Sequence, residues 1–377
     1  MLKTAKYWLI DTTLRDGEQS AGIVFSLEEK IAIATMLSEM QVPELEVGIP
    51  IMGEEEIRHI RTIQNLGLKS RITTWCRAKF EDINRACETN VESVHISFPG
   101  SEVLQKVFNM QDGQVVQAII DHVKYATKLF NYVSIGLQDV ARADMQFINL
   151  VVETAFRYGA HRIRLADSVG LMNPAQVFAL FSSLTAAFPY KCFEFHGHND
   201  LGMATANSIA ALQAGAKAVS VTVNGLGERC GNAVLAEVVM AIKHSLKEEC
   251  AIQEKYFMKS SRLVERASGQ SIPWDKPIVG AKAFMHESGI HTKAMLKDHR
   301  SYEPFEPKDV GRRREEFLIG KHLGAAGLKN ILSKHKNIKD CVVSKQCLEE
   351  IKNTVTSKKR SLTKQEAVAI YEKLIHN

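Results

Sequence analysis

The sequence lacks the marks of several specialised classes of protein. Its seven cysteines are odd in number and include no Cys-x-x-Cys pair, which argues against a disulfide scaffold and against a cysteine-ligated zinc site. No apolar run approaches about 18 residues, and the first residues carry no long apolar core with a small-residue cleavage site. Internal repeats and low-complexity stretches are also absent. We therefore expect a cytoplasmic protein with reduced thiols and no membrane segment.

The charge balance gives little support to a nucleic-acid partner. The 48 Lys and Arg residues and 43 Asp and Glu residues leave a formal charge of +5, and the basic residues are scattered except at Gly311–Arg314 and Ser357–Arg360. A small anionic substrate fits this balance better. The 377 residues, 45% hydrophobic and 24% charged, are enough for one large globular domain and an appendage.

Short β-rich runs alternate with amphipathic helical stretches along most of the chain, for example Leu27–Met40, Val115–Phe130 and Pro174–Phe188. Eight strand-then-helix units within about 250 residues have the size and count of a TIM (β/α)8 barrel, with a doubly wound open sheet as the alternative. The expected strands are Tyr7–Asp11, Glu44–Gly48, Arg71–Trp75, Val91–Ser97, Tyr132–Leu137, Arg162–Ala166, Cys192–His196 and Ala218–Asn224.

The alternation stops past about Lys247. Residues 272–300 carry two prolines, two glycines and the polar motif H-E-S-G-I-H, a mixture typical of an irregular linker. Farther on the chain again looks helical, with helices expected at Ala325–His335, Lys345–Thr354 and Thr363–His376. We expect a barrel over residues 1–255, a linker over 256–306 and a small helical C-terminal subdomain over 307–377.

The stretch Asp11–Gln19, D-T-T-L-R-D-G-E-Q, directly follows the apolar run Tyr7–Ile10. An apolar run that gives way at once to charges and a glycine is typical of a buried parallel strand that opens into a polar loop at its carboxyl end. Arg15 offers a rigid fork of donors for an oxyanion, and Asp16 is a hard oxygen ligand. The pair suggests a metal ion with an electrophilic group beside it, while an Arg–Asp pair that only caps the loop is the simpler alternative.

A second polar stretch, F-E-F-H-G-H-N-D at 193–200, supports the metal interpretation. His196 and His198 are two residues apart, so an extended backbone directs both imidazoles to the same side. With Asp16 they make a set suited to Zn, Mn, Mg or Fe, while two satisfied polar side chains are the plainer alternative. A barrel would bring to one rim the polar residues at its strand ends, which are Arg15, Asp16, Glu46, His95, Gln138, Asp139, Asp167, His196, His198 and Asn224.

Four motifs carry a resemblance to a known family. They are D-T-T-L-R-D-G-E-Q near the start, H-G-H-N-D-L-G-M-A at 196–204, N-G-L-G-E-R-C-G-N-A at 224–233 and F-M-H-E-S-G-I-H at 284–291. In this order they resemble the homocitrate synthase and isopropylmalate synthase family of metal-dependent TIM-barrel acyltransferases, over about residues 4 to 320. The length and the run W-C-R-A at 75–78 are most similar to the branch of homocitrate synthases associated with nitrogen fixation.

The resemblance implies a divalent metal ion, Mg, Mn or Zn, and a catalytic arginine beside it. Asp16, His196 and His198 match the metal ligands of the family, and Asn232 matches a position near the metal that acts through water. Arg15 matches the arginine that polarises the keto oxygen of a 2-oxo acid. A last matching position, Glu46, is the acid held against that arginine, and a purely structural buried ion pair is the alternative for it.

The resemblance also implies the substrates, acetyl-CoA and a 2-oxo acid. His291 and Tyr302 match the catalytic His and Tyr of the family, and His is the natural base for removing an α-proton of an acetyl thioester near neutral pH. Addition to 2-oxoglutarate and hydrolysis of the thioester would give homocitrate and CoA. The expected substrate-binding residues are Arg15, Gln19, His95, Arg142 and Ser168, with Arg77 and Ser97 as further candidates for the distal carboxylate.

Some positions depart from the pattern of the family, including Lys293-Ala294, which replace a more usual small or Gly-containing pair after His291. Gln138 stands where relatives usually have Glu in the sequence E-D-A-S-R, and Ser168 stands where Thr is usual. These departures bear on the identity of the 2-oxo acid, so isopropylmalate, citramalate or citrate synthesis are alternatives within the same chemistry. A lyase that runs the reverse cleavage and a non-catalytic metal-binding protein are alternatives from other classes.

The position of His291 and Tyr302 beyond the barrel bears on assembly. In the family this segment reaches across to the neighbouring subunit, so the resemblance implies a homodimer whose active sites are completed in trans.

Overall fold

The computed structural model describes residues 6–314, 317–335, 338 and 341–375. The chain divides into two compact units, Met1–Ile272 and Pro273–Asn377. We describe each unit by itself.

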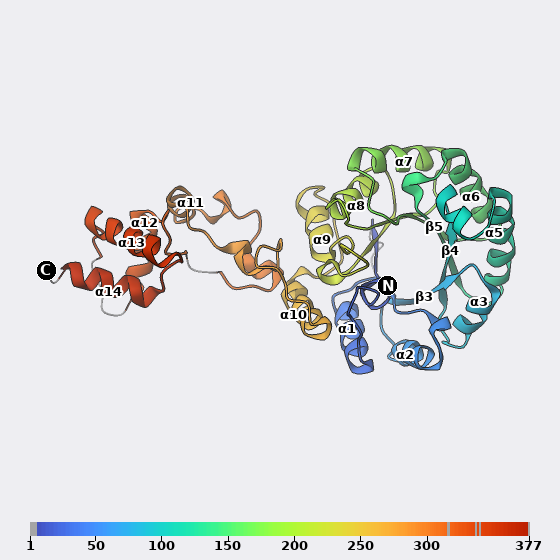
Figure 1. Cartoon of the computed structure of the whole chain (residues 1–377), viewed down its shortest axis with the longest axis horizontal. Coiled ribbons are helices and arrows are strands. Elements are labelled where there is room, and N and C mark those ends of the chain that lie inside the picture. The colour runs from blue at the N-terminus through green and yellow to red at the C-terminus, as the bar shows by residue number, and fades with distance from the viewer. Residues whose placement is uncertain (1–5, 315–316, 336–337, 339–340, 376–377) are drawn as a thin grey trace. The chain divides into compact units, whose positions relative to one another are not determined.

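The first unit is a closed barrel of eight parallel strands in the order β1 to β8, in which β8 pairs with β1 (Figure 1). The expected TIM barrel is therefore confirmed, and every expected strand is present within a few residues of its expected bounds. The largest differences are at β4, which lies two residues later at both ends, and at β8, which ends three residues earlier, at Val221. The strands are Trp8–Asp11 (β1), Glu44–Glu46 (β2), Arg71–Arg77 (β3), Ser93–Pro99 (β4), Tyr132–Gln138 (β5), Arg162–Asp167 (β6), Phe193–Gly197 (β7) and Ala218–Val221 (β8).

Helices surround the barrel (Figure 1). In α2, for example, Ile57, Ile60 and Ile63 recur at the spacing of one helical face and are buried. A capping box between Ser26 and Glu29 fixes the start of α1. The helices of this unit are Leu27–Glu39 (α1), Glu54–Gln64 (α2), Phe80–Cys87 (α3), Glu102–Val107 (α4), Asp112–Ala126 (α5), Met145–Arg157 (α6), Pro174–Ala187 (α7), Ala204–Gln213 (α8), Leu235–His244 (α9) and Phe257–Ser268 (α10).

Charged side chains lie inside the barrel, where branched apolar residues usually predominate. The residues Glu44, Glu46, Arg162, Arg164 and Glu194 are all buried, with exposures of 2% or less. They come from alternate positions of β2 and of β6 and from one position of β7. We call these five residues the charge ladder.

The second unit has its own small hydrophobic core, which includes Leu328, Ile351 and Tyr371. The three expected C-terminal helices are present, although the last expected residue, His376, lies outside the described residues. The expectation of an irregular linker over 272–300 is wrong at one point, because the residues around His291 form a short helix, α11. The helices of this unit are Gly289–Met295 (α11), Ala325–Leu332 (α12), Lys345–Lys358 (α13) and Lys364–Ile375 (α14).

Two further observations bear on the sequence-based expectations. All seven cysteines are free, which agrees with the expectation of reduced thiols. Among the helices that the structure describes, none is both long enough and apolar enough to span a bilayer.

Candidate active site

The stretch after β1 forms a single turn of π-helix, Thr13–Gly17, in place of the expected open loop. The backbone N–H groups of Arg15, Asp16 and Gly17 all donate to the carbonyl oxygen of Thr12, at 3.1, 2.9 and 3.0 Å. Such turns often occur at functional sites. Here the turn places two adjacent charged side chains, Arg15 and Asp16, in the barrel, where both are buried.

Asp16 meets the two histidines of β7 and the loop after it. The Oδ2 atom of Asp16 lies 3.1 Å from Nε2 of His196 and 4.0 Å from Nε2 of His198, and the two Nε2 atoms are 3.3 Å apart. Ligand atoms that share one ion at bonds of about 2.1 Å are spaced in the same way, roughly 3 Å from one another. Asp16 is buried, and its Oδ2 atom faces the Nε2 atoms of both histidines. The three side chains therefore fit one divalent metal ion.

The electrostatics of the three residues suit a cation. Burial alone would raise the pKa of Asp16, but Arg15 and the two histidines outweigh burial and hold the pKa well below its usual range. Burial and the neighbouring His196 lower the pKa of His198 to about 4. Near neutral pH Asp16 is thus a carboxylate and His198 a neutral imidazole with a lone pair to donate.

Glu46, the last residue of β2, forms an ion pair with Arg15. The Nε–H group of Arg15 donates to Oε1 of Glu46 at 2.6 Å, and a terminal N–H donates to Gln19 at 3.3 Å. The guanidinium also lies over the ring of Trp75, 5.8 Å from its centre. This arrangement leaves part of the guanidinium facing the cavity beside Asp16.

The cavity at this end of the barrel has a volume of about 220 Å³. It brings together most of the site residues that the sequence indicates in the barrel. Ser168 accepts a hydrogen bond from the backbone N–H of Asp139 at 2.9 Å, so its own hydroxyl proton is available to a ligand. The lining residues are Arg15, Asp16, Gln19, Trp75, His95, Ser97, Gly136, Gln138, Arg164, Ala166, Ser168, His196, His198, Glu228 and Arg229.

Asn232 lies next to this cavity. Its backbone forms a β-bridge with His198, and its side-chain amide donates to the carbonyl of Leu226 at 3.1 Å. The Oδ1 atom of Asn232 is buried and has no hydrogen-bond partner, so it remains available to a water molecule or an ion.

Comparisons with known proteins agree with this geometry. Residues 6–264 match the HMGL-like family, and residues 278–359 match the homocitrate synthase post-HMGL domain-like family. The chain is 43% identical to homocitrate synthase 1 of Nostoc sp., over 96% of both chains. The chain belongs to the homocitrate and isopropylmalate synthase family.

The same family includes relatives with different acceptors. The chain is 40% identical to 2-isopropylmalate synthase 2 of Caldanaerobacter subterraneus, over 99% of this chain and 97% of the relative. The solved HMG-CoA lyase of Bacillus subtilis shares the fold, with a TM-score of 0.65 at 20% identity over 72% of this chain and 97% of the lyase. Enzymes of this synthase family condense acetyl-CoA with a 2-oxo acid, and the protein is an enzyme of that class.

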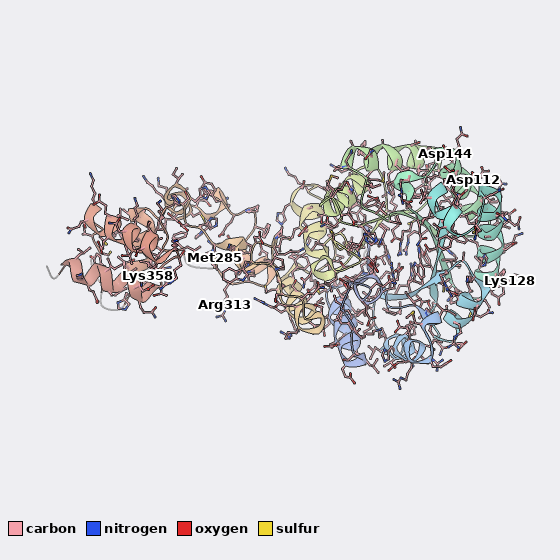
Figure 2. The ribbon with its side chains drawn as sticks, viewed as in Figure 1. Asp112, Lys128, Asp144, Met285, Arg313 and Lys358 are labelled. Carbon is pink, nitrogen blue, oxygen red and sulfur yellow. The ribbon has the colours of Figure 1, made fainter. Side chains whose placement is uncertain are left out.

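One expected substrate-binding residue of this synthase, Arg142, is not in the cavity with the others. Its guanidinium pairs with Asp139 at 2.7 Å and lines a separate, larger cavity of about 1030 Å³. Figure 2 shows Asp112 and Asp144, which line the same second cavity. The structure therefore does not bring Arg142 to the metal-ligand cluster.

Arg164 is a cavity residue that the sequence-based search missed. It lies inside β6, one inward position below the strand end, and its side chain is buried between Glu46 and Glu194. The signal for it is present in the sequence, because β6 reads R-I-R-L-A-D and places two arginines on the inward face of a barrel strand.

His291 and Tyr302 lie in the second unit and contact each other. Their rings stack with centres 3.8 Å apart and an angle of 22° between the planes. Tyr302 is 41% exposed. The two residues, eleven apart in sequence, therefore form one preassembled pair.

The metal-ligand cluster leads to a first prediction. We expect EDTA to abolish acetyl-CoA-dependent turnover, and Mn²⁺ or Zn²⁺ to restore it, because Asp16, His196 and His198 are the expected ligands of the ion. Asp16→Asn and His196→Asn should lose calorimetric Mn²⁺ binding and keep their melting temperatures near that of the wild type.

Asp200→Asn is the matched control for metal binding, because this nearby carboxylate pairs with Arg229 at 2.7 Å instead. Full turnover after thorough chelation would contradict the prediction. Loss of the cooperative melting transition on chelation would indicate a structural ion.

Proposed function

We propose that the protein condenses acetyl-CoA with 2-oxoglutarate and hydrolyses the thioester to give homocitrate and CoA. The observation that carries this choice of acceptor is the polar lining of the cavity beyond the metal-ligand cluster. His95, Ser97, Gln138 and Arg164 contribute polar side chains there, and the apolar side chains among the lining residues are those of Trp75 and Ala166. A branched apolar acceptor such as 2-oxoisovalerate needs an apolar pocket.

Gly136 leaves one of these polar side chains, His95, accessible to a ligand. A Cβ atom at position 136 would stand 2.5 Å from Nε2 of His95, so only glycine leaves that nitrogen uncovered. The Nδ1 atom of His95 is engaged with Ser134 at 2.9 Å. Burial and the charge of Arg164 hold the pKa of His95 well below its usual range, so the ring is neutral and offers one nitrogen to a ligand.

Arg15 acts on the keto group of the acceptor. Asp16, His196 and His198 would hold a divalent ion, which we propose to be Mg²⁺, Mn²⁺ or Zn²⁺, and this ion would supply Lewis-acid chemistry to the 2-oxo acid. Arg15 donates to the keto oxygen as negative charge develops on it, and Ser168 donates to the acceptor carboxylate. Glu46 keeps the Arg15 fork in place through the bond to Nε.

His291 supplies the base for the other substrate. The imidazole takes a proton from the acetyl group of acetyl-CoA, and the resulting carbon nucleophile adds to the keto carbon. Tyr302 holds the imidazole by stacking on it. Water then cleaves the thioester of homocitryl-CoA, which releases CoA and makes the sequence of steps favourable.

The substrate proposal leads to a second prediction, on acceptor preference. In a CoA-release assay we expect kcat/KM for 2-oxoglutarate to exceed that for 2-oxoisovalerate by at least about 100-fold. The reason is that the apolar side chain of 2-oxoisovalerate would leave the polar side chains of the cavity without hydrogen-bond partners. Pyruvate and oxaloacetate complete the panel, since citramalate and citrate synthesis use the same chemistry. Equal activity on 2-oxoisovalerate would refute the homocitrate assignment.

Two variants locate the site of the distal carboxylate. Ser97→Ala should raise KM for 2-oxoglutarate by about 10-fold, which is the loss of one hydrogen bond to a charged group, and leave KM for acetyl-CoA unchanged. Arg142→Ala is the comparison, because Arg142 is bound to Asp139 outside the cavity, and its KM values should stay near those of the wild type. A large rise in KM for Arg142→Ala alone would assign the carboxylate to that arginine.

We also infer a homodimer with active sites completed in trans, in a cytoplasmic enzyme of the nitrogen-fixation type. Support for shared sites comes from the resemblance to the family, in which the segment that carries His291 and Tyr302 reaches across to the neighbouring subunit. Arg15 and Glu46 belong to the first compact unit, and His291 and Tyr302 belong to the second. We propose that the chain consists of a catalytic barrel over 1–255, a linker with His291 and Tyr302 over 256–306, and a helical subdomain over 307–377.

The trans arrangement leads to a third prediction. Arg15→Ala and His291→Ala proteins, each inactive alone, should regain about a quarter of wild-type activity when refolded together, because half of the dimers are mixed and each mixed dimer has one intact site. A mixture of two differently tagged Arg15→Ala proteins is the control. Mixed dimers that form and stay inactive would show that His291 acts within its own chain.

A further inference from the structure

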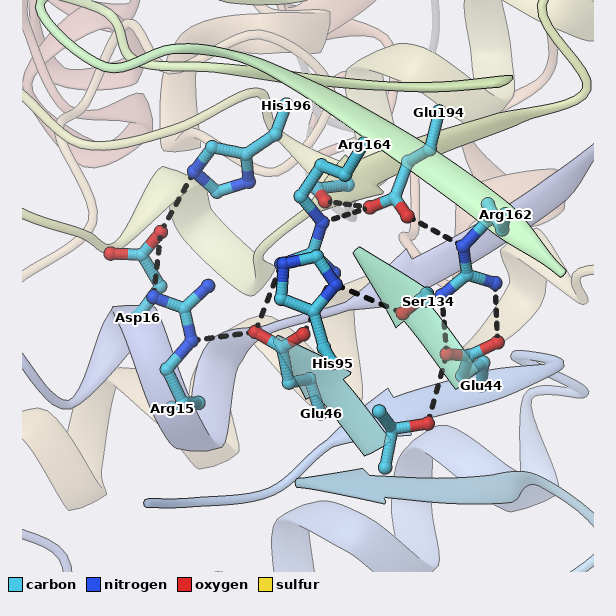
Figure 3. A network of polar contacts seen from close by, with 12 residues as sticks. Arg15, Asp16, Glu44, Glu46, His95, Ser134, Arg162, Arg164, Glu194 and His196 are labelled. Carbon is cyan, nitrogen blue, oxygen red and sulfur yellow. Dashed lines mark hydrogen bonds and ion pairs between the residues drawn. The ribbon is translucent and has the colours of Figure 1, made fainter. Parts of the chain in front are cut away.

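The charge ladder connects the interior of the barrel to Arg15 without a break (Figure 3). Arg162 donates to both oxygens of Glu44, at 2.8 and 2.7 Å. On the adjacent strand β7, Glu194 lies 2.7 Å from Nε of Arg162 and 2.6 Å from Nε of Arg164. Positive and negative groups therefore alternate along the whole ladder.

Glu46 forms the last step of the ladder and bonds to two arginines. Oε2 accepts from one terminal N–H of Arg164 at 2.7 Å, while Oε1 accepts from Nε of Arg15 at 2.6 Å and, at the longer distance of 3.3 Å, from the other terminal N–H of Arg164. Burial alone would raise the pKa of Glu46, but Arg15 and Arg164 hold the pKa well below its usual range, so the group is a carboxylate. Its orientation is thus fixed from both sides.

We propose that Arg164 is a positioning residue for the reaction, which holds Glu46 so that only one of its oxygens is available to Arg15. The inference rests on the proposed role of Arg15 at the keto oxygen. Carboxylates and guanidinium groups favour two-point contacts. Without Arg164, Glu46 has a free oxygen, and a two-point contact with Arg15 draws the terminal N–H groups of Arg15 away from the cavity and toward Glu46.

Arg162 offers a matched control within the same strand. Both arginines lie on β6, point into the barrel, are buried and contact Glu194. They differ in the second partner, which is Glu44 for Arg162 and Glu46 for Arg164. A general effect of ladder disruption would appear in variants of both arginines, and an effect on Arg15 would appear only in variants of Arg164.

The first test is kinetic. We expect Arg164→Met to lower kcat by about 100-fold, the cost of a small misplacement of a catalytic group, with KM for acetyl-CoA within about 3-fold of wild type. Arg162→Met should lose a similar number of degrees in melting temperature and keep kcat within about 3-fold of wild type. In a Glu46→Gln background, Arg164→Met should add less than about 3-fold, because Arg164 acts through Glu46.

Conservative variants keep the inference testable where methionine prevents folding. Arg164→Lys retains the charge, but a single ammonium group cannot reproduce the fork that joins Glu194 to Glu46, so kcat should still fall. Arg162→Lys is its control. Equal losses of kcat for variants of the two arginines, or losses that multiply fully in the Glu46→Gln background, would overturn the proposal.

A spectroscopic readout separates this inference from the proposed function. The Nε–H resonance of Arg15, assigned by its loss in Arg15→Lys, should shift and exchange faster with water in Arg164→Met and stay unchanged in Arg162→Met. If the resonance shifts as expected but the wild-type protein turns over no 2-oxo acid, the proposed function is refuted and the positioning of Arg15 by Arg164 still holds. An unchanged resonance in Arg164→Met would overturn the positioning role.

Discussion

The burial of charge inside the barrel is the constraint on which the rest of the structure depends. A buried carboxylate or guanidinium without a partner costs several kcal/mol, roughly, and each member of the charge ladder is stable only because the next one faces it. The side chains of a strand alternate between its two faces, so a shift of one residue in β2, β6 or β7 would turn these charges toward the helices. The ladder therefore specifies the register of the barrel as well as the orientation of Arg15.

Much of the fold and of the metal-ligand cluster could be predicted from the sequence. The alternation of strands and helices indicated eight units, and strand ends converge in a barrel whatever the details of the loops, so Asp16, His196 and His198 had to lie near one another. The ends of the strands were predicted less accurately. In β2 and β8 apolar residues continue past the last residue that is assigned to the strand. The helix at His291 was missed since its seven residues lie among prolines and glycines.

Arg142 and Arg164 show why the substrate wall was harder to predict. Both are arginines near strand ends, and the sequence favours Arg142 because it follows β5 directly. In the structure Asp139 adopts a left-handed conformation, with φ of 60°, and its carboxylate captures Arg142. Arg164 lies within a strand, where a buried arginine is usually expected to form ion pairs that only stabilise the fold. It does pair with Glu46 and Glu194, but it also lines the cavity. Arg164 lines the cavity and Arg142 does not because of the turn at Asp139 and the inward position of Arg164 on β6. Both features depend on tertiary contacts.

The ladder also has a consequence for the order in which the barrel assembles. In the closed order of strands β2 and β6 lie opposite each other, and the pairs Glu44–Arg162 and Glu46–Arg164 each join residues 118 positions apart in sequence. Such contacts bring no stabilisation until the chain between them is folded. A half-formed barrel holds unpaired charges at its centre and keeps water there, so the interior dries only when the last strands close. Bonds made that late chiefly slow unfolding, which gives the barrel kinetic persistence.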